Sequence, residues 1–514
     1  MIAAIRGALA SGERERATSM LRQNWLRLLL ESHTSELERL CIDFPDPHDP
    51  HLLLIRACCR DLAGDPHGAA FLRGQGLRTA ADDFVACFTN LLLAPDNSTK
   101  AAIADRAKLA LSECGPEDDY PSALFLLGWT EIRLRRNIPE AISLLRSASE
   151  EARLQSRDAT FRLAQSNLAF ALTHAGAFSE AERILDGLDA LPEAVETADW
   201  DRFEGGLRPS TRGTIAFWRG EYEAAATQLR SIVSTEAPGT NFEAQARLYL
   251  ILTLIALQQK ERYREAAELL QGVSTADKHG VPWGTLRRVV AAWLAYAEGQ
   301  PAVALRLAAP AVTRTGAPVA HALLGELYQR LDQADLARQA LRHATATPPP
   351  RYALVSTLVT SAALSSVAGR GQQAHEFLDR ALEAAAPERT LSPFLAPDPT
   401  VSDLLSAHTP GGTVQERVLR DVFARRDAVS QVVTGVLTQR EREILGYLRT
   451  TMTADEIAAQ LRVAYPTVKT HIRAIYRKLG VTTRRAAVRA VDAGEMGDLR
   501  VQVSGPSGRE VVGS

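Results

Sequence analysis

A small residue recurs along most of the chain at intervals that suit pairs of short helices. After Ala141 the successive gaps are 40, 44, 41, 38, 33 and 37 residues, and the gap before Ala141 is 72, enough for two repeats. The positions are Ala69, Ala141, Ala181, Ala225, Ala266, Ala304, Ala337 and Ala374, and an apolar stripe such as AERIL or AAELL follows each. Small side chains let paired helices approach closely, and stacked pairs bury a continuous core. We therefore expect an all-α solenoid of helical repeats.

A glycine often stands five positions before the recurring alanine, where the turn between paired helices would fall. These glycines are Gly64, Gly176, Gly220, Gly299 and Gly369. Glycine suits such a turn because it adopts left-handed backbone angles at little cost. The pattern resembles tetratricopeptide repeats, although its spacing is irregular and its consensus incomplete. A non-repeating helical bundle is the alternative interpretation.

Repeat arrays of this kind present a concave surface, which usually binds a peptide, a protein or a small effector. Four tryptophans could line such a surface: Trp129, Trp218, Trp283 and Trp293. Large aromatic side chains more often fill the space between helices. We expect these four to pack in the core, with ligand contact as the alternative.

A second pattern lies near the carboxyl end, in an amphipathic helix predicted from Pro466 to Leu479. Its apolar residues recur at i, i+4, i+7 and i+11, which places Val468, Ile472, Ile475 and Leu479 on one stripe. The opposite face carries Lys469, Thr470, Arg473 and Arg477. Cations and a small hydroxyl are the side chains that reach phosphates and base edges in a major groove. We interpret this helix as one that reads DNA.

Capping signals place further helices around it. Thr438 with Glu441, and Thr453 with Glu456, each have the spacing of a capping box at a helix start. Gly480 suits the end of the reading helix, and Thr482 or Thr483 could begin a fourth helix. The spacing predicts a four-helix module.

This segment resembles the LuxR-type helix-turn-helix family. The shared residues are Leu437, Thr438, Arg440, Glu441, Glu443, Ile444, Leu445, Glu456, Ile457, Ala458, Leu461, Thr467, Val468, Lys469, His471, Tyr476, Lys478, Leu479, Gly480, Val481, Arg484 and Ala487. The resemblance implies that Lys469, Thr470 and Arg473 contact bases. It implies that Thr467, His471 and Lys478 mostly position the DNA backbone, and that the last helix often makes a dimer contact.

Three positions depart from the family pattern. Ala464 stands where a serine or threonine usually caps the reading helix, a loss of roughly 1 kcal/mol. Pro466 in the first turn partly offsets that loss, because its missing N–H needs no partner there. Thr451 replaces a common glycine, and Asp455 replaces a common cation, which removes a possible phosphate contact.

The charge distribution singles out the same segment. Residues 434–497 contain 11 Lys and Arg against 6 Asp and Glu, a balance of +5, whereas the remaining 48 cations and 55 anions give −7. A basic module on an acidic body indicates that only the carboxyl-terminal part meets nucleic acid.

The combination of repeats and terminal module resembles large ATP-binding LuxR regulators, including the maltose-system activator type. Those proteins carry a nucleotidase with a phosphate loop, but no G-x-x-x-x-G-K-[ST] occurs in this chain. We therefore expect no nucleotide cofactor. HExxH and G-x-S-x-G are also absent, so we expect no catalytic residues and no enzyme.

Cysteines and histidines give weaker signals. The five cysteines, an odd number without CxxC, indicate reduced thiols in a cytosolic protein, with a redox sensor as the alternative. The run DPHDPH at residues 46–51 could bind a metal, but its prolines favour a surface turn, and we assign no metal site. No apolar run is long enough for a transmembrane helix, and the start lacks a signal-peptide core.

The sequence thus predicts four parts. Residues 1–387 form the repeat domain, 388–433 a Pro- and Gly-rich linker with a short helix from Val414 to Val432, 434–497 the helix-turn-helix domain, and 498–514 a mobile tail. The predicted function is a cytoplasmic bacterial transcription regulator that binds double-stranded DNA as a homodimer, with an effector or protein partner on the array. The alternative is a repeat scaffold that controls another regulator by heterodimerisation through its terminal module.

Overall fold

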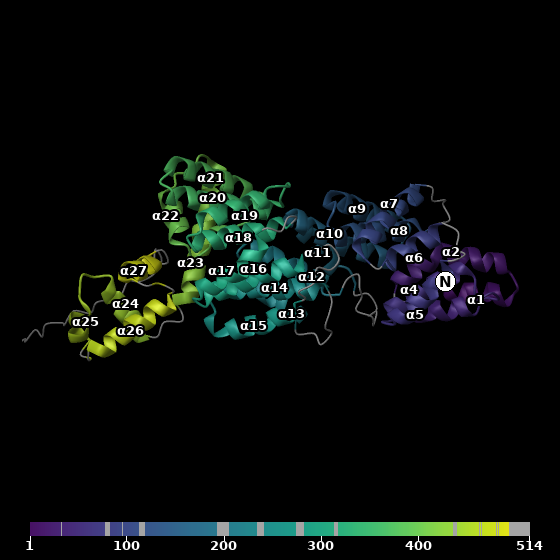
Figure 1. Cartoon of the computed structure of the whole chain (residues 1–514), viewed down its shortest axis with the longest axis horizontal. Coiled ribbons are helices and arrows are strands. Elements are labelled where there is room, and N and C mark those ends of the chain that lie inside the picture. Colours follow the sequence, from purple (N-terminus) through teal and green to yellow (C-terminus); the bar gives the residue numbers. More distant parts are fainter. Residues whose placement is uncertain are drawn as a thin grey trace, which may run out of the picture. The chain divides into compact units, whose positions relative to one another are not determined.

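The computed structural model is all-helical over the residues it describes and forms two compact units (Figure 1). It describes residues 1–492 except 32, 78–82, 95, 113–118, 193–204, 234–240, 274–281, 313–316, 435–438, 462, 464, 480 and 482. One unit, the repeat unit, comprises Met1–Pro393 and Asp398–Ser406. The other, the carboxyl-terminal unit, comprises Phe394–Pro397 and the chain from Ala407 onward. No described helix is long and apolar enough to cross a bilayer.

The first seven helices of the repeat unit bury several large side chains, among them Trp25, which is fully buried. They are α1 (Ile2–Ala10), α2 (Arg14–Leu30), α3 (Thr34–Ile42), α4 (Pro50–Leu62), α5 (Pro66–Gly76), α6 (Phe84–Leu92) and α7 (Asn97–Ser112). Helices α4 and α5 pack as a pair, and α6 packs on both α4 and α7. This part carries the first predicted repeat, around Ala69.

Seven helix pairs follow, and they confirm the predicted solenoid. The pairs are α8 (Tyr120–Leu134) with α9 (Ile138–Leu154), α10 (Asp158–Ala175) with α11 (Phe178–Asp189), α12 (Leu207–Trp218) with α13 (Tyr222–Val233), α14 (Asn241–Ala256) with α15 (Tyr263–Gln271), α16 (Trp283–Ala297) with α17 (Pro301–Ala308), α18 (Pro318–Arg330) with α19 (Ala334–Ala344), and α20 (Arg351–Val367) with α21 (Gly371–Ala385). Within each pair the helices pack together, and the first helix of each pair contacts the first helix of the next. This stacking buries the continuous core expected of repeats.

The recurring alanines lie where the sequence predicts them. All eight stand in the second helix of a pair, and none is more than 3% exposed. The five turn glycines all have left-handed backbone angles, with φ between 72° and 83°. In other turns the left-handed residue is not glycine: Arg135, Gln258 and Asp332 have φ of 51°, 53° and 58°. The four tryptophans are buried as expected, each 5% exposed or less.

Several pairs place a glycine of the first helix against a leucine of the second. A Cβ atom added to Gly128, Gly213 or Gly325 would lie 2.7, 2.6 or 2.5 Å from a side-chain carbon of the facing leucine. The leucines are Leu145, Leu229 and Leu341, each four residues after the recurring alanine. The two helices therefore approach closely where the first contributes a glycine and the second contributes the recurring alanine.

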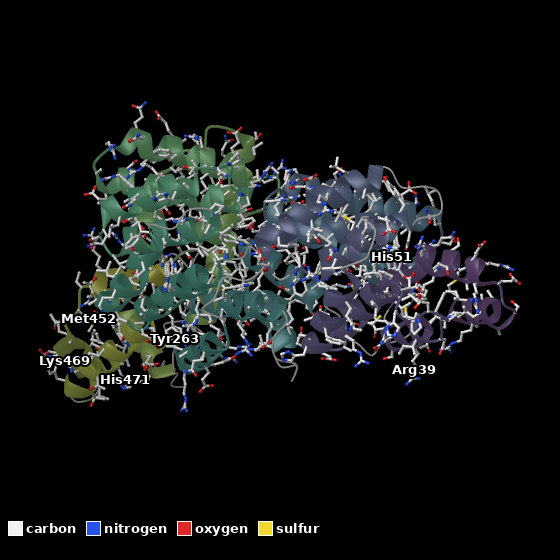
Figure 2. The ribbon with its side chains drawn as sticks, turned by 45° about the vertical axis from the view of Figure 1, so that its right-hand side comes forward. Arg39, His51, Tyr263, Met452, Lys469 and His471 are labelled. Carbon is white, nitrogen blue, oxygen red and sulfur yellow. The ribbon has the colours of Figure 1, made fainter. Side chains whose placement is uncertain are left out.

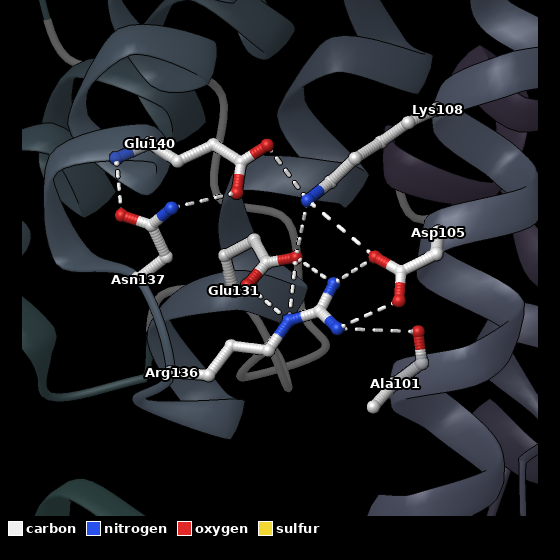
Figure 3. Close-up of polar contacts among 7 residues, drawn as sticks. All are labelled: Ala101, Asp105, Lys108, Glu131, Arg136, Asn137 and Glu140. Carbon is white, nitrogen blue, oxygen red and sulfur yellow. Dashed lines mark hydrogen bonds and ion pairs between the residues drawn. The ribbon is translucent and has the colours of Figure 1, made fainter.

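Charged side chains join α7, α8 and α9 (Figure 3). Glu131 of α8 has no exposed side-chain surface, yet Arg136 Nε donates to its Oε2 at 2.8 Å and Lys108 Nζ lies 2.8 Å from its Oε1. Lys108 also pairs with Glu140 at 2.7 Å, and Arg136 donates to Asp105 at 3.0 Å. Burial raises the pKa of Glu131, but the hydrogen bonds from Arg136 and Lys108 outweigh it and hold the pKa below its usual value.

The array also makes contacts between segments distant in sequence. The ring of Phe178 stacks on that of Tyr352, with centroids 5.6 Å apart. The N–H and hydroxyl of Ser179 donate to Glu388 at 2.7 and 2.8 Å, and Arg219 Nε donates to the Glu388 carbonyl at 3.1 Å. Tyr222 and Ser392 share a hydrogen bond of 3.1 Å. The pairs α10–α11 and α12–α13 thus contact α20, in the last pair of the array, and the residues that follow α21.

The segment between the array and the terminal helices is partly helical. It contains the 3₁₀ helix η3 (Ser392–Phe394), α22 (Pro399–Ala407) and α23 (Thr413–Thr434). The last of these covers the short helix expected from Val414 to Val432. The remaining helices are α24 (Gln439–Leu448), α25 (Ala454–Gln460), α26 (Tyr465–Lys478) and α27 (Arg484–Asp492).

Replacing Gly325 by alanine should destabilise the array by about 1 kcal/mol. The overpacking cost against Leu341, about 1–3 kcal/mol, exceeds the helix-propensity gain of up to about 1 kcal/mol. In a Leu341→Ala background the same change should be neutral or stabilising, because the added methyl group then has room. Urea unfolding of the full chain measures both. Gly187→Ala is the control, since a Cβ there meets no atom within 4 Å; equal stabilisation by G187A and G325A would contradict this packing.

Replacing Glu131 by glutamine should cost about 1–3 kcal/mol, because the two cations lose one charged acceptor but keep Asp105 and Glu140. The folded-state pKa of Glu131 is lowered from 4.5, so its contribution is complete above pH 4.5 and is lost as the pH falls further. Unfolding midpoints of wild type and E131Q, measured at pH 7 and near pH 3, should therefore converge at the acid pH. A constant difference between them would show that ionisation of Glu131 is not involved.

Candidate nucleic-acid interface

The reading helix is held by a small apolar core within the carboxyl-terminal unit. Val468 and Ile475 are fully buried, Leu479 is nearly so, and Ile472 packs against them from the rim. They pack in one cluster with apolar side chains of α24, α25 and α27, which are Ile444, Leu445, Leu448, Ile457, Ala458 and Ala487. The stripe predicted for residues 466–479 is therefore the buried side of α26.

The opposite face of α26 carries the predicted DNA-contacting residues. Thr467, Lys469, Thr470 and Arg473 are exposed, and His471 is half-buried. Lys469 Nζ lies 5.7 Å from the ring centroid of Tyr465, a contact that leaves the ammonium group at the surface. Figure 2 shows Lys469 and His471 at the edge of this unit. The side chains of Arg477 and Lys478 lie outside the described residues.

Two of the predicted helix caps are present. Thr453 accepts from the N–H of Glu456, and Glu456 accepts from the N–H of Thr453 at 2.7 Å, which completes the capping box. Thr483 caps α27 by accepting from the N–H of Ala486 at 3.2 Å, and Thr482 lies outside the described residues. Thr438, Ala464 and Gly480 lie outside the described residues. Asp455 is exposed in the first turn of α25.

Comparison with known families assigns most of the carboxyl-terminal unit to a family of bacterial regulators. Residues 435–491 match the family GerE, described as bacterial regulatory proteins of the luxR family. The carboxyl-terminal domain is a LuxR-family helix-turn-helix. The match covers none of the repeat unit. A chain in the crystal structure of the APC/C hetero-tetramer Cut9–Hcn1 aligns with 96% of this chain and 94% of its own length, at 12% identity and a TM-score of 0.42.

Arg484 of the LuxR-family domain has a structural role that the sequence did not reveal. Its guanidinium group donates to the carbonyls of Leu448 at 3.0 Å, Tyr447 at 3.2 Å and Thr450 at 2.7 Å, and also to Met452. These carbonyls belong to the end of α24 and the turn after it, where helical partners are lacking. Arg484 thus fastens the start of α27 to the end of α24.

Arg440 makes a similar connection on the other side of the domain. Its guanidinium donates to Glu443 at 2.6 Å and to the carbonyl of Leu461 at 3.1 Å. Leu461 is the residue that ends α25, so the bond links α24 to that end. Arg440 and Arg484 of the basic segment therefore form hydrogen bonds within the domain. The net charge of +5 counted for residues 434–497 is thus larger than the charge available to DNA.

The other candidate sites resolve into structural features. Asp49, in the DPHDPH run, starts α4 by accepting from the N–H groups of His51 and Leu52 at 2.9 and 3.2 Å. His51 Nε2 lies 3.0 Å from Asp83 Oδ2, and its Nδ1 lies 3.0 Å from Arg22. Among the described residues no three His, Cys, Asp or Glu side chains are placed to hold a metal ion.

The described cysteines do not resemble reactive thiols. Cys41, Cys58, Cys59 and Cys87 are all buried, and none forms a disulfide. Burial raises the pKa of Cys41 to about 12, so this group stays a thiol at neutral pH. Cys114 lies outside the described residues.

Replacing Arg484 by lysine should destabilise the LuxR-family domain by about 2–3 kcal/mol, because one ammonium group cannot bond carbonyls that a guanidinium fork reaches together. Hydrogen exchange of α24 and α27 amides in the full chain would measure the loss. The matched control is Arg485→Lys, since Arg485 is the exposed neighbour on the same helix. Equal protection in the two variants would exclude this role for Arg484.

Proposed function

We propose that this chain is a transcription regulator in which the repeat array receives a signal and the LuxR-family domain binds double-stranded DNA. The observation that supports DNA binding most directly is the exposed face of α26. There Lys469, Thr470 and Arg473 lie opposite the buried stripe, on a helix whose diameter fits the major groove. Family membership of residues 435–491 supports the same assignment.

Within this proposal each residue of the face has a role. Lys469 and Arg473 donate to acceptor groups on base edges, guanine O6 and N7 above all, and Thr470 contacts the same edge. Thr467, His471 and Lys478 bind phosphates and set the depth of the helix in the groove. Arg477 follows Arg473 by one turn and extends the same contact.

The proposal requires two copies on the DNA, since one helix contacts few bases. Two copies on paired half-sites double the contacts and set the half-site spacing. The repeat domain, predicted at residues 1–387, would receive a small effector or a protein partner in the cytoplasm. Binding of this signal would change the fraction of molecules that can dimerise or bind DNA. This requires only that the signal bind the competent and the incompetent conformations with different affinities.

Replacing Lys469 or Arg473 by alanine should weaken binding to a selected operator by about 1–3 kcal/mol each, the value of a bidentate base contact. Fluorescence anisotropy with operators selected from random duplexes by the full chain measures the effect. A phosphate contact would instead lower the slope of log K against log salt by about 1 without changing base preference. Arg153→Ala, which removes an exposed arginine of the repeat unit, is the matched control.

The alternative function, control of another regulator by heterodimerisation, predicts a different result. The exposed Asp455 on α25 weakens phosphate binding and is the observation that favours it. In that case the full chain would fail to retard random duplex DNA even at low salt, yet would form a stoichiometric complex with a second LuxR-family protein. Retardation that is lost on raising the salt concentration would reject this alternative.

A further inference from the structure

One tyrosine of the LuxR-family domain takes no part in the apolar core of that domain. Residues 435–491 contain three tyrosines, and two of them, Tyr447 and Tyr476, pack against the core cluster. Tyr465, the first residue of α26, is instead 40% exposed. A single exposed aromatic ring is ordinary on a protein surface, so its meaning depends on what lies beside it.

The side chain beside Tyr465 is that of Lys469, one helical turn further along α26. Residues four apart are neighbours on a helix surface, so Tyr465, Lys469 and Arg473 form one row. The ammonium group of Lys469 lies 5.7 Å from the ring centroid of Tyr465, within the range of a cation–π contact. Such a contact strengthens when water is removed, as happens when a helix enters a groove of DNA. The ring therefore favours orientations of Lys469 that keep its ammonium group on this row.

Tyr465 also lies at the end of α26 that is best placed to meet bases. In helix-turn-helix domains the amino-terminal residues of the second helix contact base edges in the major groove. The apolar group that the major groove presents is the 5-methyl group of thymine, whereas the other groups there are hydrogen-bond donors and acceptors. An aromatic ring at this end of the helix therefore suits a thymine.

A phosphate contact through the Tyr465 hydroxyl is the competing role, because tyrosine hydroxyls also bind the DNA backbone. The contact with Lys469 favours the base contact. The ring holds an ammonium group that the proposed function directs at a base edge, so the ring lies on the same side of α26 as that base.

We propose that Tyr465 is a specificity-determining residue whose ring covers the 5-methyl group of a thymine next to the base that Lys469 contacts. Lys469 would donate to the O6 and N7 acceptors of a guanine, and the thymine would occupy a neighbouring base pair. This inference rests on the proposed function, because it adds a contact to the same face of α26.

The test measures binding of the full chain to operators selected from random duplexes, with each thymine in turn replaced by deoxyuridine. This replacement removes only the 5-methyl group. At one thymine it should weaken the binding of wild type about 4-fold, the value of one buried methyl group, and should leave the binding of Tyr465→Ala unchanged. That thymine should lie next to the base pair at which Lys469→Ala relaxes base preference. A sensitive thymine further away, or equal weakening of wild type and Y465A at every thymine, would overturn the proposal.

Two further variants separate the ring from the hydroxyl and from aromatic surface in general. Tyr465→Phe keeps the ring, so its affinity and its response to deoxyuridine should match those of wild type. A loss of affinity in Y465F equal to that in Y465A would assign the contact to the hydroxyl and overturn the proposal. Phe423→Ala, which removes an exposed ring from α23 of the same unit, is the matched control and should change neither quantity.

Hydrogen exchange guards against a variant that merely unfolds the domain. Protection of the α24 and α26 amides should be the same in wild type and Y465A, because Tyr465 lies outside the core cluster. Lower protection in Y465A would show a structural role and overturn the proposal. A wild-type chain that binds no selected operator would refute the proposed function together with this inference. Binding without a thymine effect that depends on Tyr465 would refute this inference alone.

Discussion

Close approach of two helices is the constraint on which the repeat unit depends. An alanine in the second helix and a glycine in the first allow backbones to come near enough for a leucine to fill the space between them, as Gly325 and Leu341 show. Apolar burial of this kind supplies most of the stability of a helical repeat, because each pair exposes an apolar face until the next pair covers it. The turn geometry and the stacking order both follow from pairs that hold this spacing.

The repeat architecture could be predicted because it depends on local patterns. Eight recurring alanines, five of which follow a glycine by five residues, were sufficient to place eight helix pairs. The turns at Arg135, Gln258 and Asp332 were not predictable in this way, since their left-handed residues carry side chains and resemble ordinary surface positions. The bonds from Ser179 and Arg219 to Glu388 depend on small rotations accumulated over five pairs, and no local pattern encodes that sum.

In the LuxR-family domain the buried stripe of α26 was predictable from helical spacing, and Lys469 and Arg473 lie on the opposite face as expected. From the sequence, Arg484 was only one of the residues shared with the LuxR-type family and one cation of a basic segment, and no role was predicted for it. A signal was available: a positive side chain in the first turn of α27 opposes the helix dipole, so it needs a compensating partner. Here the carbonyls at the end of α24 provide that partner.

The contacts of Glu388 show that residues after the last helix pair belong to the folded array. A polypeptide shortened after residue 387 would keep every helix pair but would leave the N–H of Ser179 and the Nε of Arg219 without the acceptors that Glu388 provides. A polypeptide that continued through Ser406 would keep those acceptors, the Tyr222–Ser392 bond and nearly all of α22. The shortest polypeptide that keeps all of these bonds therefore extends beyond the last helix pair. The Pro-rich stretch after α21 binds back to earlier helix pairs as well as linking the array to the helices that follow.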